Sequence, residues 1–153
     1  MSEAATLPAQ TQASASPERL DLQQIQAHFD RSPFIAWLQL QALEVDHEAG
    51  ELTVHAPFQE ALGRSANTGQ WHGGPLAAVI DTVGDFAVGM LVGRGLPTIN
   101  FRVDYLRPAI GTHLKAVAKA RRVGKTVGVA DVDLFNDQGV LVAIGRASYA
   151  TLG

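Results

Sequence analysis

Residues 70–90 read QWHGGPLAAVIDTVGDFAVGM, in which a His-Gly-Gly turn and a proline precede an apolar stretch that carries two aspartates. Pro75 suits the first turn of a helix, and the glycines at positions 93 and 95 suit its C-terminus, so we predict a helix over about 75–92. A helix that is apolar around its circumference is expected to be buried. It is shorter than the roughly 20 apolar residues of a membrane span and carries two carboxylates, which argues against a membrane.

Two aspartates in a buried helix are expected to have either a binding partner or a function. Asp81 lies too far beyond Gly74 to cap the helix N-terminus. Burying an unpaired carboxylate costs several kcal/mol, which favours a functional role for Asp81 over a purely structural ion pair. Asp85 falls one turn later on the same face, and two neighbouring carboxylates raise the pKa of at least one of them. For Asp85, a surface or interface position without a catalytic role is an equal alternative.

The turn before the helix is suited to presenting backbone amides. The glycines of His72-Gly73-Gly74 let a ligand approach closely, and a helix N-terminus favours developing negative charge. We therefore predict an oxyanion hole in which Gly73 supplies the amide and Gly74 lies beside the ligand. His72 is expected to orient the turn through hydrogen bonds.

The remaining sequence predicts one α+β domain over residues 18–153. Residues 1–17 are poor in large apolar side chains and rich in Ser, Pro and Gln, and we expect them to be disordered. They lack the features of a signal peptide, and the chain has no cysteine, so a cytoplasmic protein is expected. Ser16 and Pro17 are expected to begin an amphipathic helix that reaches Phe29.

Strand-like segments flank the apolar helix. The pattern predicts strands near residues 37–45, 51–56, 98–106, 114–123, 126–135 and 140–151, with a loop over 58–71. The segment TINFRVDYL (98–106) alternates, which predicts one packed face with Ile99, Phe101, Val103 and Tyr105 and one polar face. Short connections predict an antiparallel sheet wrapped around the central helix.

Charge is distributed unevenly along the chain. Residues 90–153 hold nine Lys and Arg against four Asp and Glu, whereas residues 1–89 hold three against eleven. The basic half is expected to attract an anionic ligand, although ordinary surface charge is an equal alternative. The predicted anion-binding side chains are Arg102, Arg107, Arg121, Arg122 and Lys125, and we rank the last three first because they cluster at one turn, where a phosphate can be reached without burying the charge. No basic run or recognition helix predicts nucleic acid as a partner.

Common catalytic and metal-binding motifs are absent from the sequence. GKT at 124–126 lacks the earlier glycine of a phosphate-binding loop, because Lys119 occupies that position, and a hairpin turn is expected there. The five histidines have no metal-ligand spacing, so neither a metal nor another cofactor is predicted.

These motifs together resemble those of the hotdog-fold acyl-CoA thioesterases of the phenylacetate-pathway (PaaI-like) family. The resemblance covers about residues 34–151 and rests on Asn67, His72-Gly73-Gly74, Asp81, the segment FRVDYLRPA and the terminal GVLVAIGRASYAT. It implies a five- or six-stranded antiparallel sheet around the helix, a homodimer or homotetramer, and thioester hydrolysis in a cleft between subunits. CoA would be part of the substrate.

The sequence departs from the family pattern at two positions. Relatives place Asn or Gln six residues before the histidine, where this chain has Ala66 followed by Asn67. They often place Thr or Ser four residues after the helix carboxylate, where this chain has Asp85. The resemblance implies that Asp81 acts as a general base on water or as a nucleophile. A non-catalytic acyl-CoA-binding module and a hotdog hydratase or dehydratase are alternatives.

Helix length predicts where the site is assembled. Seven residues separate Gly74 from Asp81, which is roughly 10 Å along a helix and further than an aspartate side chain reaches. The Gly73 amide and Asp81 are therefore expected to meet only if they come from two subunits related by a two-fold axis.

Overall fold

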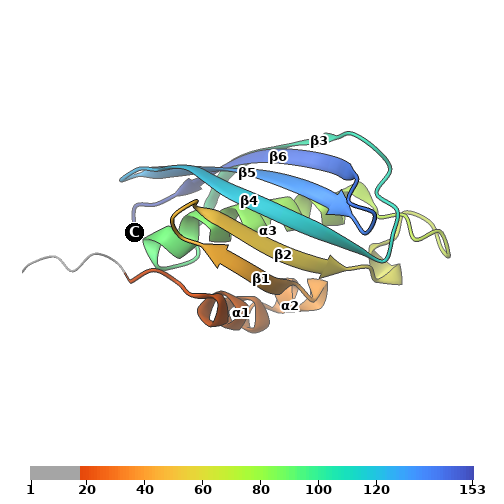
Figure 1. The fold of residues 1–153 in the computed structure, drawn as a ribbon, viewed down its shortest axis with the longest axis horizontal. Coiled ribbons are helices and arrows are strands. Elements are labelled where there is room, and N and C mark those ends of the chain that lie inside the picture. Colours follow the sequence, from red (N-terminus) through yellow and green to blue (C-terminus); the bar gives the residue numbers. More distant parts are fainter. Residues whose placement is uncertain (1–17) are drawn as a thin grey trace, which may run out of the picture.

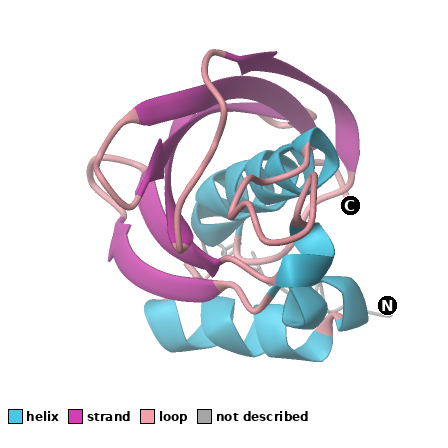
Figure 2. Ribbon diagram, turned by 90° about the vertical axis from the view of Figure 1, so that its right-hand side faces the viewer, coloured by secondary structure: helices cyan, strands magenta, loops and turns pink. Residues whose placement is uncertain are grey.

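A six-stranded antiparallel sheet curves around one long helix, α3 (Gly73–Val92), in a computed structural model that describes residues 18–153 (Figure 1 and Figure 2). The expected disorder of residues 1–17 lies outside the described residues. The sheet order is β1-β2-β4-β5-β6-β3, so β1 and β3 form its two edges. The strands are β1 (Gln41–Asp46), β2 (Glu51–Pro57), β3 (Thr98–Tyr105), β4 (His113–Val123), β5 (Val127–Asn136) and β6 (Leu141–Ala150). The predicted α+β fold and the hairpin turn at 124–126 are confirmed.

Helix α3 lies in the hollow of the sheet and supplies much of the core. By length and composition it could cross a membrane, but 56% of its most apolar window is buried inside this fold. Two glycines where α3 meets the sheet, Gly84 on the helix and Gly145 on β6, allow close packing. At Gly84 a Cβ would overlap the hydroxyl of Tyr149, and at Gly145 a Cβ would overlap the side chain of Ile80. The helix ends at Gly93, whose φ of 91° is the left-handed conformation that glycine accepts.

The first helix starts later than its sequence pattern predicts. The predicted helix is wrong over residues 18–21, which are not helical, and α1 (Leu22–Arg31) has Asp21 as its N-cap; Ser16 and Pro17 lie outside the described residues. Asp21 and Gln24 form a capping box, which satisfies two backbone amides at the new start. Phe29 packs edge-on against Phe86 of α3 at a centroid distance of 5.1 Å, which joins α1 to the core.

A second short helix replaces the first part of a predicted strand. Residues 33–38 form α2 (Pro33–Leu38), and the strand begins only at Gln41, so the predicted strand over 37–45 is wrong at its start. Pro33 occupies the first helical position, where its missing N–H costs nothing. Gln39 ends the helix with a φ of 55°. A 3₁₀ turn, η1 (Glu60–Leu62), lies within the predicted loop.

Strand β3 pairs only with β6 and leaves its outer edge free within residues 18–153. Ile99, Phe101 and Tyr105 are 53%, 43% and 56% exposed, and only Val103 of the predicted packed face is half-buried. The alternation predicted the strand but wrongly predicted a face buried within this chain. An apolar face beside an unpaired strand edge is what an interface between chains requires.

Candidate active site

Asp81 lies in the middle of α3 and lines a cavity of about 310 Å³. The Thr98 hydroxyl donates a hydrogen bond of 2.8 Å to Asp81 Oδ1, which fixes the direction of the carboxylate. The Tyr149 hydroxyl donates to the backbone carbonyl of Asp81 at 2.8 Å, and its pKa is raised chiefly by burial. The cavity is also lined by Ser32, Phe34, Ile35, Ala78, Thr82, Asp85 and Phe101. Asp81 therefore has both a polar partner and access to a cavity.

Asp85 lines the same cavity, as its position one helical turn after Asp81 predicts. Its Oδ1 accepts a hydrogen bond of 2.7 Å from the Leu96 amide, in the loop that follows α3. The pKa of Asp85 is raised to about 7, mainly by burial and in smaller part by the neighbouring Asp81, whereas the hydrogen bond from the Leu96 amide and the charge of Arg94 oppose the shift. The prediction that one of the two carboxyl pKa values is raised is confirmed, with burial as the larger cause.

The turn at 72–74 forms the N-terminus of α3. His72 is the N-cap residue, and its Nδ1 accepts a hydrogen bond of 3.1 Å from the Gly74 amide. The His72 amide donates to the Leu62 carbonyl at 2.9 Å. His72 therefore fixes the turn, in agreement with its predicted orienting role, and occupies the Gly74 amide. The Gly73 amide donates no hydrogen bond to any residue in 18–153.

A second cavity, of about 400 Å³, adjoins Gly73. The Tyr105 hydroxyl donates to the Gly73 carbonyl at 2.8 Å and so ties the end of β3 to the start of α3. The other lining residues are Arg64, Gln70, Trp71, His72, Leu76, Leu106, Arg107, Pro108 and Ala109. None of them lines the cavity at Asp81. Within one chain, Gly73 and Asp81 thus open into different cavities.

Asn67 lies apart from both cavities. It lies in the exposed loop before α3 with a φ of 59°. Its backbone amide donates a hydrogen bond of 2.6 Å to Glu60 Oε1. A positive φ is tolerated better by asparagine than by most residues, because its short polar side chain can bond locally. In this chain Asn67 stabilises the loop 58–71, and its side chain lines neither cavity.

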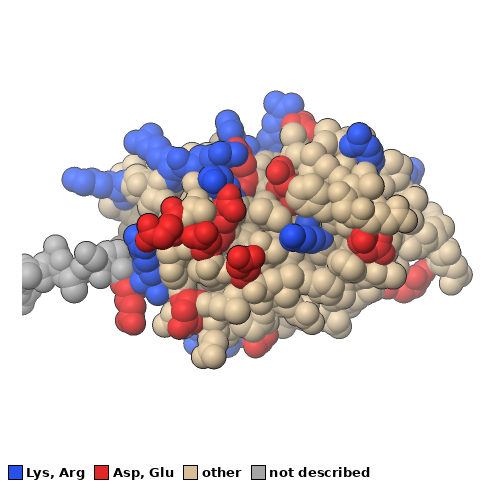
Figure 3. Space-filling view, viewed as in Figure 1, with Lys and Arg blue, Asp and Glu red and all other residues tan. Residues whose placement is uncertain are grey.

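The predicted anion-binding residues are divided among three places. Arg107 lines the Gly73 cavity, with Arg64 from the loop before α3 beside it. Arg102 pairs with Asp104 at 2.9 Å on the outer face of the sheet. Arg122 and Lys125 are exposed at the β4–β5 turn. Basic side chains gather at the upper left of Figure 3, at the end of the molecule where Figure 1 places this turn.

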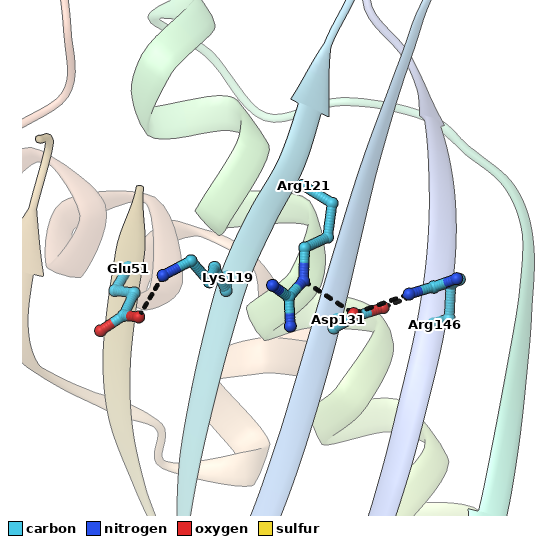
Figure 4. Close-up of polar contacts among 5 residues, drawn as sticks. All are labelled: Glu51, Lys119, Arg121, Asp131 and Arg146. Carbon is cyan, nitrogen blue, oxygen red and sulfur yellow. Dashed lines mark hydrogen bonds and ion pairs between the residues drawn. The ribbon is translucent and has the colours of Figure 1, made fainter. Parts of the chain in front are cut away.

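Arg121 belongs to a network of ion pairs across the outer face of the sheet (Figure 4). Asp131 on β5 binds Arg146 at 2.6 Å and Arg121 at 2.8 Å, and Lys119 pairs with Glu51 at 2.8 Å. The pKa of Asp131 is lowered, mainly by Arg146 and then by Arg121. The carboxylate is shared by two guanidinium groups and offsets part of the charge of Arg121, which reduces its attraction for another anion.

Three residues beside the two cavities were not predicted from the sequence as site residues. Thr98 is the first residue of a strand, and nothing in its local pattern distinguishes it from other strand threonines. Tyr105 was assigned to a packed face, and Arg64 lies in the acidic half of the chain. Only the fold brings these side chains to Asp81 and Gly73. No group of three His, Cys, Asp or Glu side chains suited to a metal ion occurs in the described part of the chain.

Comparisons with known proteins agree with this fold. Residues 68–143 match the model of the thioesterase superfamily. A putative esterase from Halobacterium salinarum is 35% identical over 136 residues, which are 82% of this chain and 88% of that protein. The medium/long-chain acyl-CoA thioesterase YigI from Escherichia coli is 31% identical over 138 residues, covering 65% of this chain and 89% of YigI.

A solved structure extends the agreement to three dimensions. The PaaI protein from the phenylacetic acid degradation operon of E. coli superposes with a TM-score of 0.71 at 25% identity, over 86% of this chain and 92% of PaaI. The resemblance to PaaI-like hotdog thioesterases that the motifs around α3 predict is confirmed. The chain, with its His-Gly-Gly turn and helix aspartate inside a curved antiparallel sheet, belongs to the thioesterase superfamily.

Proposed function

We propose that this protein hydrolyses acyl-CoA thioesters to a free carboxylic acid and CoA. The observation that carries the proposal is the pairing of two features on α3. These are a carboxylate held by a hydroxyl at a cavity, Asp81 with Thr98, and an unengaged amide at the helix N-terminus, Gly73. A base and an oxyanion donor are the two groups that acyl transfer to water requires. The names of YigI and PaaI as acyl-CoA thioesterases support CoA as the thiol.

The proposed reaction uses the two groups in sequence. The thioester carbonyl oxygen accepts a hydrogen bond from the Gly73 amide, and the positive end of the α3 dipole stabilises the charge that develops there. Asp81 removes a proton from water as its oxygen attacks the carbonyl carbon. The carbon–sulfur bond then breaks, and CoA leaves as the thiolate and takes up that proton. Direct attack by Asp81, followed by hydrolysis of the anhydride, gives the same products.

We propose that each site is shared between two subunits. Gly73 and Asp81 of one chain open into different cavities, and β3 carries an exposed apolar face along an unpaired edge. Two β3 edges related by a two-fold axis would pair antiparallel and cover this apolar surface. The same axis would place the α3 helices antiparallel, with Gly73 of one chain facing Asp81 of its partner. A dimer or a dimer of dimers is consistent with this arrangement.

The CoA nucleotide is proposed to bind beside the oxyanion donor. Arg64 and Arg107 line the cavity at Gly73 and bring two positive charges within reach of phosphates. Arg122 and Lys125 at the β4–β5 turn are the alternative pair. Arg102 and Arg121 are less suited, because Asp104 and Asp131 already offset part of their charges.

A comparison of two double variants tests this assignment. Replacing Arg64 and Arg107 with alanine is expected to raise KM for an acyl-CoA about tenfold at low ionic strength, and less at high salt, because salt screens the lost attraction. The matched variant replaces Arg122 and Lys125 and is expected to leave KM within about twofold. A rise in KM for the second variant alone would indicate that the nucleotide binds at the β4–β5 turn instead.

A thiol-release screen tests the proposed activity itself. The purified protein is incubated with a panel of aryl-CoA and aliphatic acyl-CoA esters of increasing chain length, and free CoA thiol is measured with a chromogenic thiol reagent. We expect at least one ester to give turnover well above the uncatalysed rate. Binding of acyl-CoA without thiol release would support a non-catalytic module. A change in enoyl-CoA absorbance without thiol release would support a hydratase or dehydratase.

A further inference from the structure

Asp81 and Asp85 are both tied to one short segment after α3. The Leu96 amide donates to Asp85 Oδ1 at 2.7 Å, and two residues later the Thr98 hydroxyl donates to Asp81 Oδ1 at 2.8 Å. Between them, the Pro97 carbonyl accepts a hydrogen bond from the Ala150 amide at 2.8 Å, which anchors the segment to the end of β6. The segment that carries Thr98 is therefore held on one side by Asp85, through the Leu96 amide, and on the other by β6, through the Pro97 carbonyl.

The surroundings of Asp85 make its charge depend on pH near neutrality. The titratable groups that face it are Asp81 on its own helix, Arg94 in the following loop and Tyr149 on β6. From α2, its N-cap residue and β3 the cavity receives only uncharged side chains, those of Ser32, Phe34, Ile35, Thr98 and Phe101. Burial is the main reason why the pKa of Asp85 rises to about 7. An ionised carboxylate accepts an amide hydrogen bond more strongly than a protonated one.

With the thioester hydrolysis proposed above as the reaction, we propose that Asp85 is a positioning residue for Asp81. Its ionised carboxylate holds the Leu96 amide, fixes the segment Leu96–Thr98 and so directs the Thr98 hydroxyl at Asp81. Protonation of Asp85 weakens its hold on the Leu96 amide. Asp85 does not contact the reacting atoms in this proposal.

The pH profile of kcat/KM for two variants tests the proposal. In the wild type, kcat/KM is expected to rise several-fold between about pH 6 and about pH 8 as Asp85 ionises. Asp85→Asn keeps an oxygen that accepts from Leu96 but cannot ionise. The kcat/KM of this variant is therefore expected not to rise with pH. It should stay, up to about pH 8, near the value that the wild type has at about pH 6. Asp85→Ala leaves the Leu96 amide without its partner and is expected to fall below Asp85→Asn throughout, by about tenfold.

Thermal unfolding provides a readout that does not depend on the reaction. A carboxyl whose pKa is raised by folding binds its proton more tightly in the native state, so stability falls as pH rises from the unfolded value toward about 7. The Tm of Asp85→Asn is therefore expected to exceed that of the wild type above neutral pH, with the difference vanishing in acid. An unchanged Tm difference across this range would overturn the assigned titration.

The two proposals fail in different ways. One result is that no acyl-CoA ester releases thiol, while the Tm of Asp85→Asn exceeds that of the wild type above neutral pH. In that case the raised pKa of Asp85 is supported and the proposed reaction is wrong. If the enzyme is active but the rise in kcat/KM persists in Asp85→Asn, or if Asp85→Ala matches Asp85→Asn, Asp85 is not a positioning residue for Asp81.

Discussion

Replacing Asp81 with asparagine is expected to lower kcat/KM for acyl-CoA hydrolysis by about 10² to 10⁴-fold, the usual contribution of a general base. The amide cannot accept a proton from water and cannot act as a nucleophile. Its Oδ1 can still accept the hydrogen bond that Thr98 donates in the wild type at 2.8 Å. The loss is therefore expected to be chemical, with little change in structure.

Two measurements separate loss of chemistry from loss of fold. Thiol release gives kcat/KM, and thermal unfolding followed by circular dichroism gives Tm, which is expected to change little for Asp81→Asn. The matched control is Asp133→Asn, the same substitution at an exposed carboxylate on β5 that lines neither proposed cavity. This control is expected to retain wild-type activity. Near-wild-type turnover of Asp81→Asn would refute the role of Asp81.

Mixing two inactive variants is expected to restore activity if the sites are shared between subunits. The first is Gly73→Pro, which removes the donor amide. Proline is well tolerated at the first position of a helix, and His72 before it has the extended conformation that a following proline requires. The second is Asp81→Asn. In a mixed dimer, one site combines the intact Gly73 of one chain with the intact Asp81 of the other.

The expected recovery follows from counting sites. A mixed dimer has one intact site of two, and random exchange makes about half of the dimers mixed, so about a quarter of the wild-type activity should return. Differently tagged subunits and sequential affinity steps establish that exchange has occurred. Gly73→Ala is the control, because it adds the same Cβ beside Tyr105 but keeps the amide, and it is expected to stay active. Confirmed exchange without recovery would exclude shared sites.

The central helix and its turn were predictable from sequence because their signals are local. An apolar run with Pro near its start and Gly after its end predicts a buried helix, and the helix is observed from Gly73 to Val92. The pairing of Asp81 and Asp85 on one face follows from the helical period alone. The role of His72 at the turn also depends on a contact only two residues long.

Two predictions from local sequence patterns were wrong, one for the start of β1 and one for the packed face of β3. The segment that begins at Trp37 has the composition of a strand, but Pro33 starts a helix that includes its first two residues, and the strand begins only at Gln41. Alternation along β3 predicts two faces, but it cannot tell whether the apolar face is covered by this chain or by another. Strand β3 is an edge strand only because the sheet order places β6 on one side of it and no strand of this chain on the other.

The sequence by itself determined the fold class and the family, and it led to Gly73 and Asp81 as the two proposed groups of the site, because these depend on helix period, turn chemistry and short motifs. The tertiary structure alone decided which side chains contact Gly73 and Asp81. Thr98 reaches Asp81 across 17 residues, Tyr105 reaches Gly73 across 32, and Tyr149 reaches the Asp81 backbone across 68. Contacts of that range arise from sheet order and register, which are properties of the whole chain and leave no trace in the neighbouring sequence.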